Sequence, residues 1–234
     1  ADPAGGATDG FTDAPHTRVR RAVAARLTES KQTVPHFYVR GTANVEALIA
    51  LRAQLNGDTP VKVSFNDLLV KAVAVAHRRH PEMNVIWTHD AVRAFEHVDI
   101  AVAIASERGL VTPVLRGVDT MSITQVAEAV RAFAERADAG TLKQRELEGG
   151  TVSLSNLGMF GVEEFSAIIN PPHASILSVG AIREEPVVRE GGLGVGRVLH
   201  LVLSVDHRPV DGASAAAWMR TFLSLLERPV QILA

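Results

Sequence analysis

The sequence contains no cysteine. This absence excludes disulfide bonds, a thiolate nucleophile and any cysteine-ligated metal site, and it is compatible with a reducing compartment. If acyl chemistry takes place on this chain, the chain must therefore activate a thiol that belongs to another molecule.

The chain also lacks a strong charge of either sign, a long apolar run and a signal peptide. Its formal net charge of −2 gives no electrostatic reason to expect nucleic acid or an anionic membrane as a partner. No apolar stretch is long enough to span a bilayer, and no basic region precedes an apolar one at the start. The nine histidines show no convincing metal-ligand spacing, since the closest pair, His77 and His80, brackets two arginines that suit a helix C-terminus. No membrane, nucleic-acid or metal function is predicted.

What is present is enough apolar sequence for a substantial core. Hydrophobic residues make up 47% of the 234 positions, enough for one large domain or two small ones. Residues 1–16 are instead rich in Ala, Gly and Pro without apolar periodicity, so we interpret them as a linker, with a disordered terminal tail as the alternative. The folded region is expected to begin at residue 17.

Hydrophobic periodicity divides this region into helices and strands. Helices are predicted at residues 18–32, 45–55, 65–80, 122–137 and 211–226, and strands at 36–43, 100–105, 110–115, 176–182 and 198–205. Residues 149–161 are predicted as a further strand that runs into a loop displaying Ser155 and Asn156. Pro113 predicts an edge position or a bulge in its strand, and Gly191–Gly196 is interpreted as a flexible hairpin loop because it lacks the order of a phosphate-binding motif. Strands joined by hairpins, without regular strand–helix alternation, favour a mixed sheet with packed helices, a two-layer α+β sandwich.

One turn carries the strongest chemical signal. His207 lies between the predicted strand at 198–205 and the helix at 211–226, a position that holds a side chain rigidly while leaving it accessible. An imidazole takes and returns a proton near neutral pH, which makes His207 a candidate general base. Two structural interpretations stay open: Asp211 is also a suitable N-cap for the helix, and a lone histidine is often structural.

Five segments, taken in order, resemble one family. They are Val19–His36, Gly109–Leu115, Gly149–Gly161, Ile169–Pro172 and Asp206–Gly212. In these the chain resembles the catalytic cores of dihydrolipoamide acyltransferases, the E2 components of 2-oxo acid dehydrogenase complexes of the pyruvate or branched-chain type. The resemblance implies a chloramphenicol acetyltransferase-like fold, with trimers that hold active sites between subunits and build a 24-mer or 60-mer core. The apolar tail at residues 228–234 would act as a peg between trimers.

The resemblance also implies a domain organisation and a location. Residues 1–16 would be the end of an interdomain linker, and residues 17–234 the acyltransferase domain. Lipoyl and peripheral-subunit-binding domains would precede this linker and recruit the E1 and E3 components. The protein would be cytoplasmic in a bacterium or reside in the mitochondrial matrix of a eukaryote.

Residue roles follow from the same match. His207 corresponds to the family's catalytic base, and Ser155 to the hydroxyl that stabilises the oxyanion from the neighbouring subunit. Asp211 would hold the loop through an ion pair, with Arg20 or Arg21 as possible partners. Asn156 and Gly158 would shape the substrate channel, although Gly158 is equally explained as a turn glycine. Coenzyme A would be a substrate, with the lipoyl group on a separate domain and no metal.

Alternatives remain from other functional classes. The chain could be a non-catalytic scaffold core, or a free-standing CoA-dependent acetyltransferase acting on a small hydroxyl acceptor. The segments 155–161 and 169–172 look most like acetyl-transferring cores; a short branched-chain acyl group stays open and succinyl is disfavoured. One or two methylenes in an acyl pocket are worth only about 1–3 kcal/mol, a difference that this sequence does not reveal.

Overall fold

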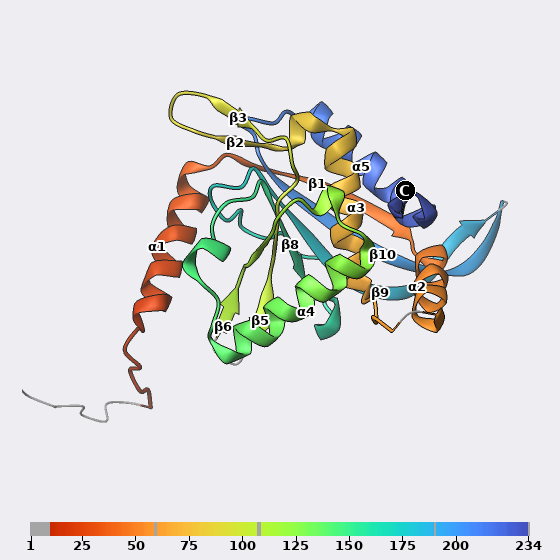
Figure 1. Cartoon of the computed structure of the whole chain (residues 1–234). Helices are drawn as coiled ribbons and strands as arrows, with labels where there is room; N and C mark the ends of the chain where they lie inside the picture. The colour runs from red at the N-terminus through yellow and green to blue at the C-terminus, as the bar shows by residue number, and fades with distance from the viewer. Residues whose placement is uncertain (1–9, 59, 107–108, 190, 234) are drawn as a thin grey trace, which may run out of the picture.

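A layer of helices packs on one mixed sheet in the computed structural model, which describes residues 10–58, 60–106, 109–189 and 191–233 (Figure 1). The helices are α1 (Arg18–Thr33), α2 (Glu46–Asp58), α3 (Phe65–Arg79), α4 (Ile123–Ala139) and α5 (Gly212–Glu227). The strands are β1 (His36–Asn44), β2 (Val85–Trp87), β3 (Val92–Ala94), β4 (Ile100–Val102), β5 (Ile104–Ser106), β6 (Gly109–Val111), β7 (Val114–Leu115), β8 (Val152–Asn156), β9 (Ser175–Arg189) and β10 (Gly192–Asp206). Short 3₁₀ turns are η1 (Pro81–Met83), η2 (Val118–Thr120), η3 (Gln144–Glu146), η4 (Gly158–Phe160) and η5 (Pro229–Ile232). The predicted two-layer α+β architecture is confirmed.

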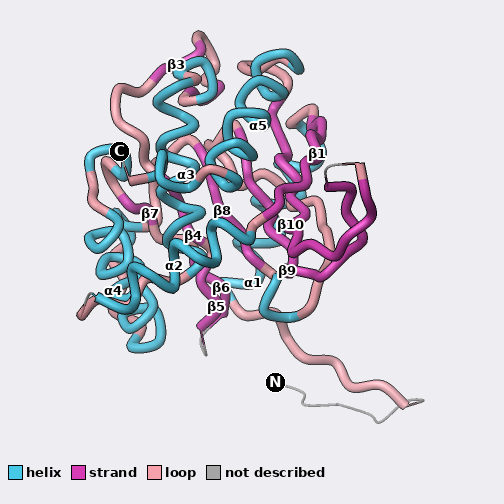
Figure 2. Tube along the Cα trace, turned by 90° about the vertical axis from the view of Figure 1, so that its right-hand side faces the viewer, coloured by secondary structure: helices cyan, strands magenta, loops and turns pink. Residues whose placement is uncertain are grey.

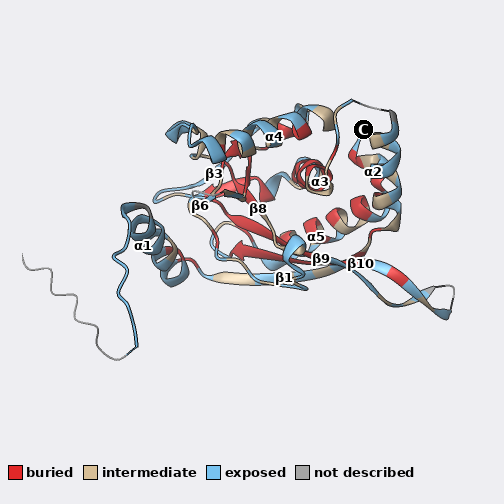
Figure 3. Ribbon diagram, turned by 90° about the horizontal axis from the view of Figure 1, so that it is seen from below, coloured by how far each residue is buried: buried red, intermediate tan, exposed pale blue. Residues whose placement is uncertain are grey.

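The main sheet has the strand order β1-β10-β9-β8-β4-β7. Strand β8 runs parallel to its neighbours β4 and β9, and the other pairs are antiparallel. Strands β9 and β10 form a long hairpin whose far end extends beyond the helices as a twisted ribbon (Figures 1 and 3). The hairpin returns the end of β10 to the start of β1, where Asp206 pairs with His36.

The helical layer and one face of the sheet enclose the core. Figure 2 looks onto this layer, with α2 to α5 in front of β4 and β8, and the burial colours of Figure 3 show α3 enclosed between the other helices and the sheet. Trp218 and Phe222 of α5 are fully buried and stacked, with ring centroids 5.0 Å apart. Gly41 lets α5 approach β1, since a Cβ there would lie 2.9 Å from Leu223 Cδ1. No described helix has the length and hydropathy needed to cross a bilayer.

The opposite face of the sheet is covered by the irregular segment 162–174. The Ser204 hydroxyl donates to the Ala167 carbonyl over 2.8 Å, and the Ala167 N–H donates to Ser178 Oγ over 3.2 Å. From α1, the Ser30 hydroxyl donates to the Ile169 carbonyl over 2.6 Å. Small hydroxyl side chains thus bind backbone that has no strand partner, which lets an irregular segment lie against a sheet.

One local prediction is wrong, and one hairpin was missed. Residues 192–196 are not a loop: they belong to β10 and pair with residues 185–189 of β9. A glycine-rich segment has a low propensity to form a strand. This segment is nevertheless a strand, because its backbone forms hydrogen bonds with β9. The hairpin of β2 and β3 was not predicted at all, because its three-residue strands are too short to show a period.

The hairpin at residues 100–115 is confirmed in its described part. Strand β5 pairs with β6, β4 pairs with β7, and β7 forms the edge of the sheet, as Pro113 predicted. Two residues of the predicted turn, 107 and 108, lie outside the described residues, as do residues 1–9 of the predicted linker.

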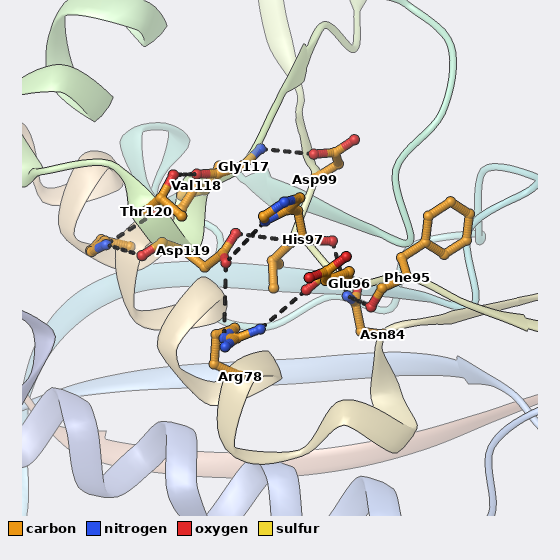
Figure 4. A network of polar contacts seen from close by, with 12 residues as sticks. Arg78, Asn84, Phe95, Glu96, His97, Asp99, Gly117, Val118, Asp119 and Thr120 are labelled. Atoms are coloured by element: carbon orange, nitrogen blue, oxygen red, sulfur yellow. Dashed lines mark hydrogen bonds and ion pairs between the residues drawn. The ribbon is translucent and has the colours of Figure 1, made fainter.

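A network of polar contacts fixes the segment that leads into β4 (Figure 4). Asp119 Oδ1 accepts the Val98 N–H over 2.9 Å, and Arg78, at the C-terminal end of α3, donates to the Glu96 carbonyl over 3.1 Å. His77 of α3 and His80, the residue that caps this helix, bond to α5 and not to each other: the Trp218 indole N–H donates to His77 Nδ1 over 3.1 Å, and His80 Nε2 lies 2.7 Å from Thr221 Oγ1. Among the described residues, no group of three His, Asp or Glu side chains is arranged to hold a metal.

Two buried histidines make the stability of this fold depend on pH. Burial lowers the pKa of both His77 and His173 from 6.5 to about 4, so both stay neutral in the folded chain while an unfolded chain protonates them. Because the unfolded state then binds more protons, stability is fully present above pH 6.5 and is lost as the pH falls toward 4. We expect each histidine to remove about 2 kcal/mol from the free energy of unfolding between pH 7 and pH 5.

Urea unfolding of wild type and His173→Gln at both pH values tests this expectation. Glutamine does not titrate, and its amide can replace the ring contacts to Ser153 Oγ and the Gly149 carbonyl. The variant should lose about 2 kcal/mol less than wild type between pH 7 and pH 5. An equal loss in both proteins would contradict the assignment.

Candidate active site

His207 is the first residue after β10, on the loop that leads into α5. Its backbone N–H donates to the Pro35 carbonyl over 3.0 Å, and the Asp206 N–H before it donates to the Ala174 carbonyl over 2.8 Å. The imidazole lies beside the Phe37 ring, tilted by 49° with ring centroids 4.6 Å apart, while the residue as a whole is exposed. The backbone is therefore fixed and the ring remains accessible, the arrangement that a general base requires.

The residues on either side of His207 form an ion pair between a buried aspartate and a half-buried arginine. Arg208 donates to the Asp206 carboxylate through Nη2 at 2.7 Å, through Nε at 3.0 and 3.2 Å and through its backbone N–H at 3.0 Å. Asp206 is only 2% exposed, so this pairing offsets the cost of burying its charge. The guanidinium also lies 5.5 Å from the ring centroid of Trp87. No role was predicted for Asp206, Arg208 or Trp87, although the charged residues on both sides of His207 were a visible signal.

Asp211 is the N-cap of α5. Its Oδ1 accepts the Ser214 N–H over 2.8 Å, which confirms the capping interpretation. The hydrogen bonds from Ser214 lower the pKa of Asp211, and the nearby His207 lowers that pKa further. Within the described part of one chain no ion pair joins Asp211 to Arg20 or Arg21, and Arg21 donates instead to the His16 carbonyl. An ionised carboxylate thus lies four residues after the imidazole and stabilises the loop through the helix end.

Ser155 and Asn156 end strand β8, and Gly158 follows in η4. Asn156 Oδ1 accepts the Gly158 N–H over 2.8 Å, so this side chain shapes the turn that follows Ser155. Gly158 does not have a positive φ. The close approach of two backbone segments explains this glycine, because a Cβ there would lie 2.5 Å from the Gly180 carbonyl oxygen.

One chain does not bring Ser155 to His207. Ser155 lies opposite Ser178 of β9. His207 lies two residues beyond Val205, which lies opposite Ser175 toward the other end of the strand. About five residues along the strands and two strand spacings across the sheet separate the two positions, roughly 15–20 Å. A single carbonyl cannot contact both side chains of one chain.

These features together define a class of fold. A six-stranded mixed sheet under a helical layer is an architecture shared with chloramphenicol acetyltransferase. A chloramphenicol acetyltransferase structure superposes with a TM-score of 0.54 over 82% of this chain and 86% of its own, at 16% identity, which supports the fold alone.

The chain belongs to the 2-oxoacid dehydrogenases acyltransferase (catalytic domain) family, whose pattern matches residues 8–234. It is 42% identical over 226 residues to the dihydrolipoyllysine-residue acetyltransferase component of the mitochondrial pyruvate dehydrogenase complex of Dictyostelium discoideum, covering 95% of this chain and 36% of that protein. The corresponding component from Rhizobium meliloti is also 42% identical, over 94% of this chain and 51% of its own length. The chain therefore spans about a third to a half of these relatives.

A solved relative matches nearly the whole chain. The cubic core of the pyruvate dehydrogenase multienzyme complex superposes with a TM-score of 0.91 at 30% identity, over 96% of this chain and 94% of that one. The predicted family and the chloramphenicol acetyltransferase-like fold are both confirmed.

Proposed function

We propose that the chain transfers an acyl group between a dihydrolipoyl thiol and coenzyme A, and that it forms the oligomeric core of a 2-oxo acid dehydrogenase complex. The observation that carries this proposal is His207, an accessible imidazole on a backbone fixed at both ends, with an ionised carboxylate four residues later. The absence of cysteine agrees with it, because both reacting sulfurs belong to substrates.

In the proposed reaction the His207 imidazole takes the thiol proton of coenzyme A, and the thiolate attacks the thioester carbonyl of the acyl-dihydrolipoyl group. The new C–S bond produces a tetrahedral oxyanion, to which the Ser155 hydroxyl donates a hydrogen bond. Such a donor is worth about a hundredfold to a thousandfold in rate. The old C–S bond then breaks, and the imidazolium returns the proton to the dihydrolipoyl sulfur. Direct transfer needs no acyl-enzyme, since both substrates meet in one site.

The distance between Ser155 and His207 supports a site shared by two chains. In a cyclic assembly, His207 of one chain can meet Ser155 of the next, and each interface then forms one complete site. We propose a trimer as this unit, with trimers joined through the apolar tail at 228–234 into a 24-mer or 60-mer core. In that tail Ile232 is buried in its own chain, whereas Leu233 is 42% exposed and available for such a contact.

Mixing two inactive variants tests the shared site. Ser155→Ala chains co-expressed with His207→Ala chains form mixed trimers in which one interface holds both wild-type residues. Random mixing should restore about a quarter of the wild-type rate, whereas each variant alone stays near background. The control mixes His207→Ala chains with His207→Ala/Ser155→Ala chains, which cannot form a complete site. Recovery no greater than in this control would contradict the two-chain arrangement.

Acetyl is the acyl group that we propose first, with a short branched-chain group second and succinyl third. The assay compares transfer from acetyl-, isobutyryl- and succinyl-CoA to free dihydrolipoamide. A wild-type protein that assembles but transfers none of the three would favour a scaffold, and a lone trimer that acylates a small hydroxyl acceptor would favour a free-standing acetyltransferase. We propose that Asn156 and Gly158 shape the wall of the substrate channel without contacting the reacting atoms.

The remaining assignments concern the larger protein. We propose that residues 1–16 are an interdomain linker and residues 17–234 the acyltransferase domain, with lipoyl and E1- and E3-recruiting domains on the rest of the protein. The location that fits is the bacterial cytoplasm or, in a eukaryote, the mitochondrial matrix. The relative from Dictyostelium is mitochondrial by name.

A further inference from the structure

Trp87 is the exposed last residue of β2, in the hairpin β2–β3, far in sequence from the loop of His207. A large indole that is 41% exposed on a three-residue strand contributes little to the core. The contact that accounts for its position is the one with Arg208, whose guanidinium carbon lies 5.5 Å from the ring centroid. An arginine at this distance from an indole makes a cation–π interaction, and tryptophan is the strongest aromatic partner.

Arg208 in turn closes a short ring of contacts around His207. The Asp206 carboxylate accepts both the backbone N–H and the guanidinium of Arg208, so it spans the peptide units on either side of the histidine. With the Asp206 and His207 N–H groups bonded to Ala174 and Pro35, the backbone at 206–208 is left with little freedom. The direction in which the imidazole points then depends on these contacts of Asp206 and Arg208 remaining in place.

The hairpin itself is held firmly enough to act as a support. Asn84, just before β2, donates from Nδ2 to the Phe95 carbonyl at 2.8 Å and to the His97 carbonyl at 3.0 Å, which ties the two ends of the hairpin together. Its Oδ1 accepts the Thr151 hydroxyl over 2.6 Å, which ties the hairpin base to the segment before β8. Trp87 therefore presents its ring to Arg208 from a fixed base.

We propose that Trp87 is a positioning residue for His207: its indole holds the Arg208 guanidinium on Asp206 and thereby fixes the loop that carries the base. This inference rests on the proposed acyl transfer. It adds that the hairpin β2–β3 contributes to the chemical step without touching either substrate.

Four variants test the proposal. Trp87→Leu keeps an apolar side chain but removes the ring, Trp87→Phe keeps a weaker aromatic face, and Arg208→Lys keeps the charge but loses the planar two-point contact. Val92→Ala is the matched control, since Val92 pairs directly with Trp87 and is similarly exposed. It weakens the hairpin without removing the ring.

The expected result is a fall in kcat with no change in KM for coenzyme A. Trp87→Leu should lower kcat about threefold to thirtyfold, the range of one cation–π contact, with Trp87→Phe in between and Val92→Ala at the wild-type value. Because Trp87 acts through Arg208, Trp87→Leu should cost less in the Arg208→Lys background than in wild type. Equal kcat for Trp87→Leu and Val92→Ala, or fully additive effects, would overturn the proposal.

A second measurement separates this inference from the proposed function. In protein labelled with ¹³C at histidine Cε1, the resonance that disappears in His207→Gln reports the environment of that ring. Trp87→Leu and Arg208→Lys should shift or broaden this resonance, and Val92→Ala should leave it in place. If wild type transfers no acyl group, the function fails while this test still decides the positioning. An unmoved resonance in an active protein rejects the positioning alone.

Discussion

Replacing His207 with alanine is expected to lower the rate of acyl transfer from acetyl-CoA to dihydrolipoamide by about a hundredfold to ten-thousandfold at pH 7. A free thiol has a pKa of about 8.5, so without a base little thiolate is available at neutral pH. The deficit should therefore shrink as the pH rises toward 8.5, where the solvent alone forms the thiolate. The measurement is kcat for wild type and variant across this pH range.

The variant should otherwise resemble wild type. His207 is exposed and its ring contacts only Phe37 among the aromatic side chains described, so particle size and melting temperature should not change. His97→Ala is the matched control, because its side chain is 62% exposed and pairs with Asp119 and not with a residue of the loop that carries His207. A deficit that stays constant with pH would indicate that His207 binds substrate without moving a proton. No deficit at all would reject the proposed base.

Replacing Gly180 with alanine should destabilise the fold more than any other glycine-to-alanine change in the described chain. A Cβ at this position would lie 1.8 Å from the Glu163 carbonyl oxygen, which is impossible without moving the crossing segment 162–174. That segment is held by the Ala181 N–H, which donates to the Val162 carbonyl over 2.7 Å. Overpacking of this kind costs about 1–3 kcal/mol, and backbone, unlike a flexible side chain, yields little, so we expect about 3 kcal/mol or more.

Urea unfolding at one fixed protein concentration measures this effect, with Gly57→Ala as the control. Gly57 is the next-to-last residue of α2, and a Cβ there meets nothing within 4 Å. Alanine should stabilise the protein there by up to about 0.5 kcal/mol, less than in a helix interior. The two substitutions add the same methyl group and should therefore change the free energy of unfolding in opposite directions. Equal effects would show that the crossing segment moves aside at little cost.

Local sequence determined much of the fold and the chemistry. Continuous apolar runs marked β10 and α3, and the pair Ser122 and Gln125 marked the capping box at the start of α4. These features are predictable because hydrophobic periodicity and helix capping involve residues only a few positions apart in the sequence. The absence of cysteine and the position of His207 between a strand and a helix were likewise readable from the sequence alone.

The tertiary structure decided what depends on partners far along the chain. Residues 192–196 become a strand only because β9 lies beside them, and Gly158 is needed because Gly180 crosses it. Trp87 meets Arg208 across about 120 positions of sequence, a contact that no periodicity predicts. The separation of Ser155 from His207 likewise follows from strand order, which propensity and pattern leave open. The type and local spacing of residues in the sequence determined which side chains are available for the chemistry. The distances between these side chains, such as that from Ser155 to His207, were decided by which strands pair in the folded chain.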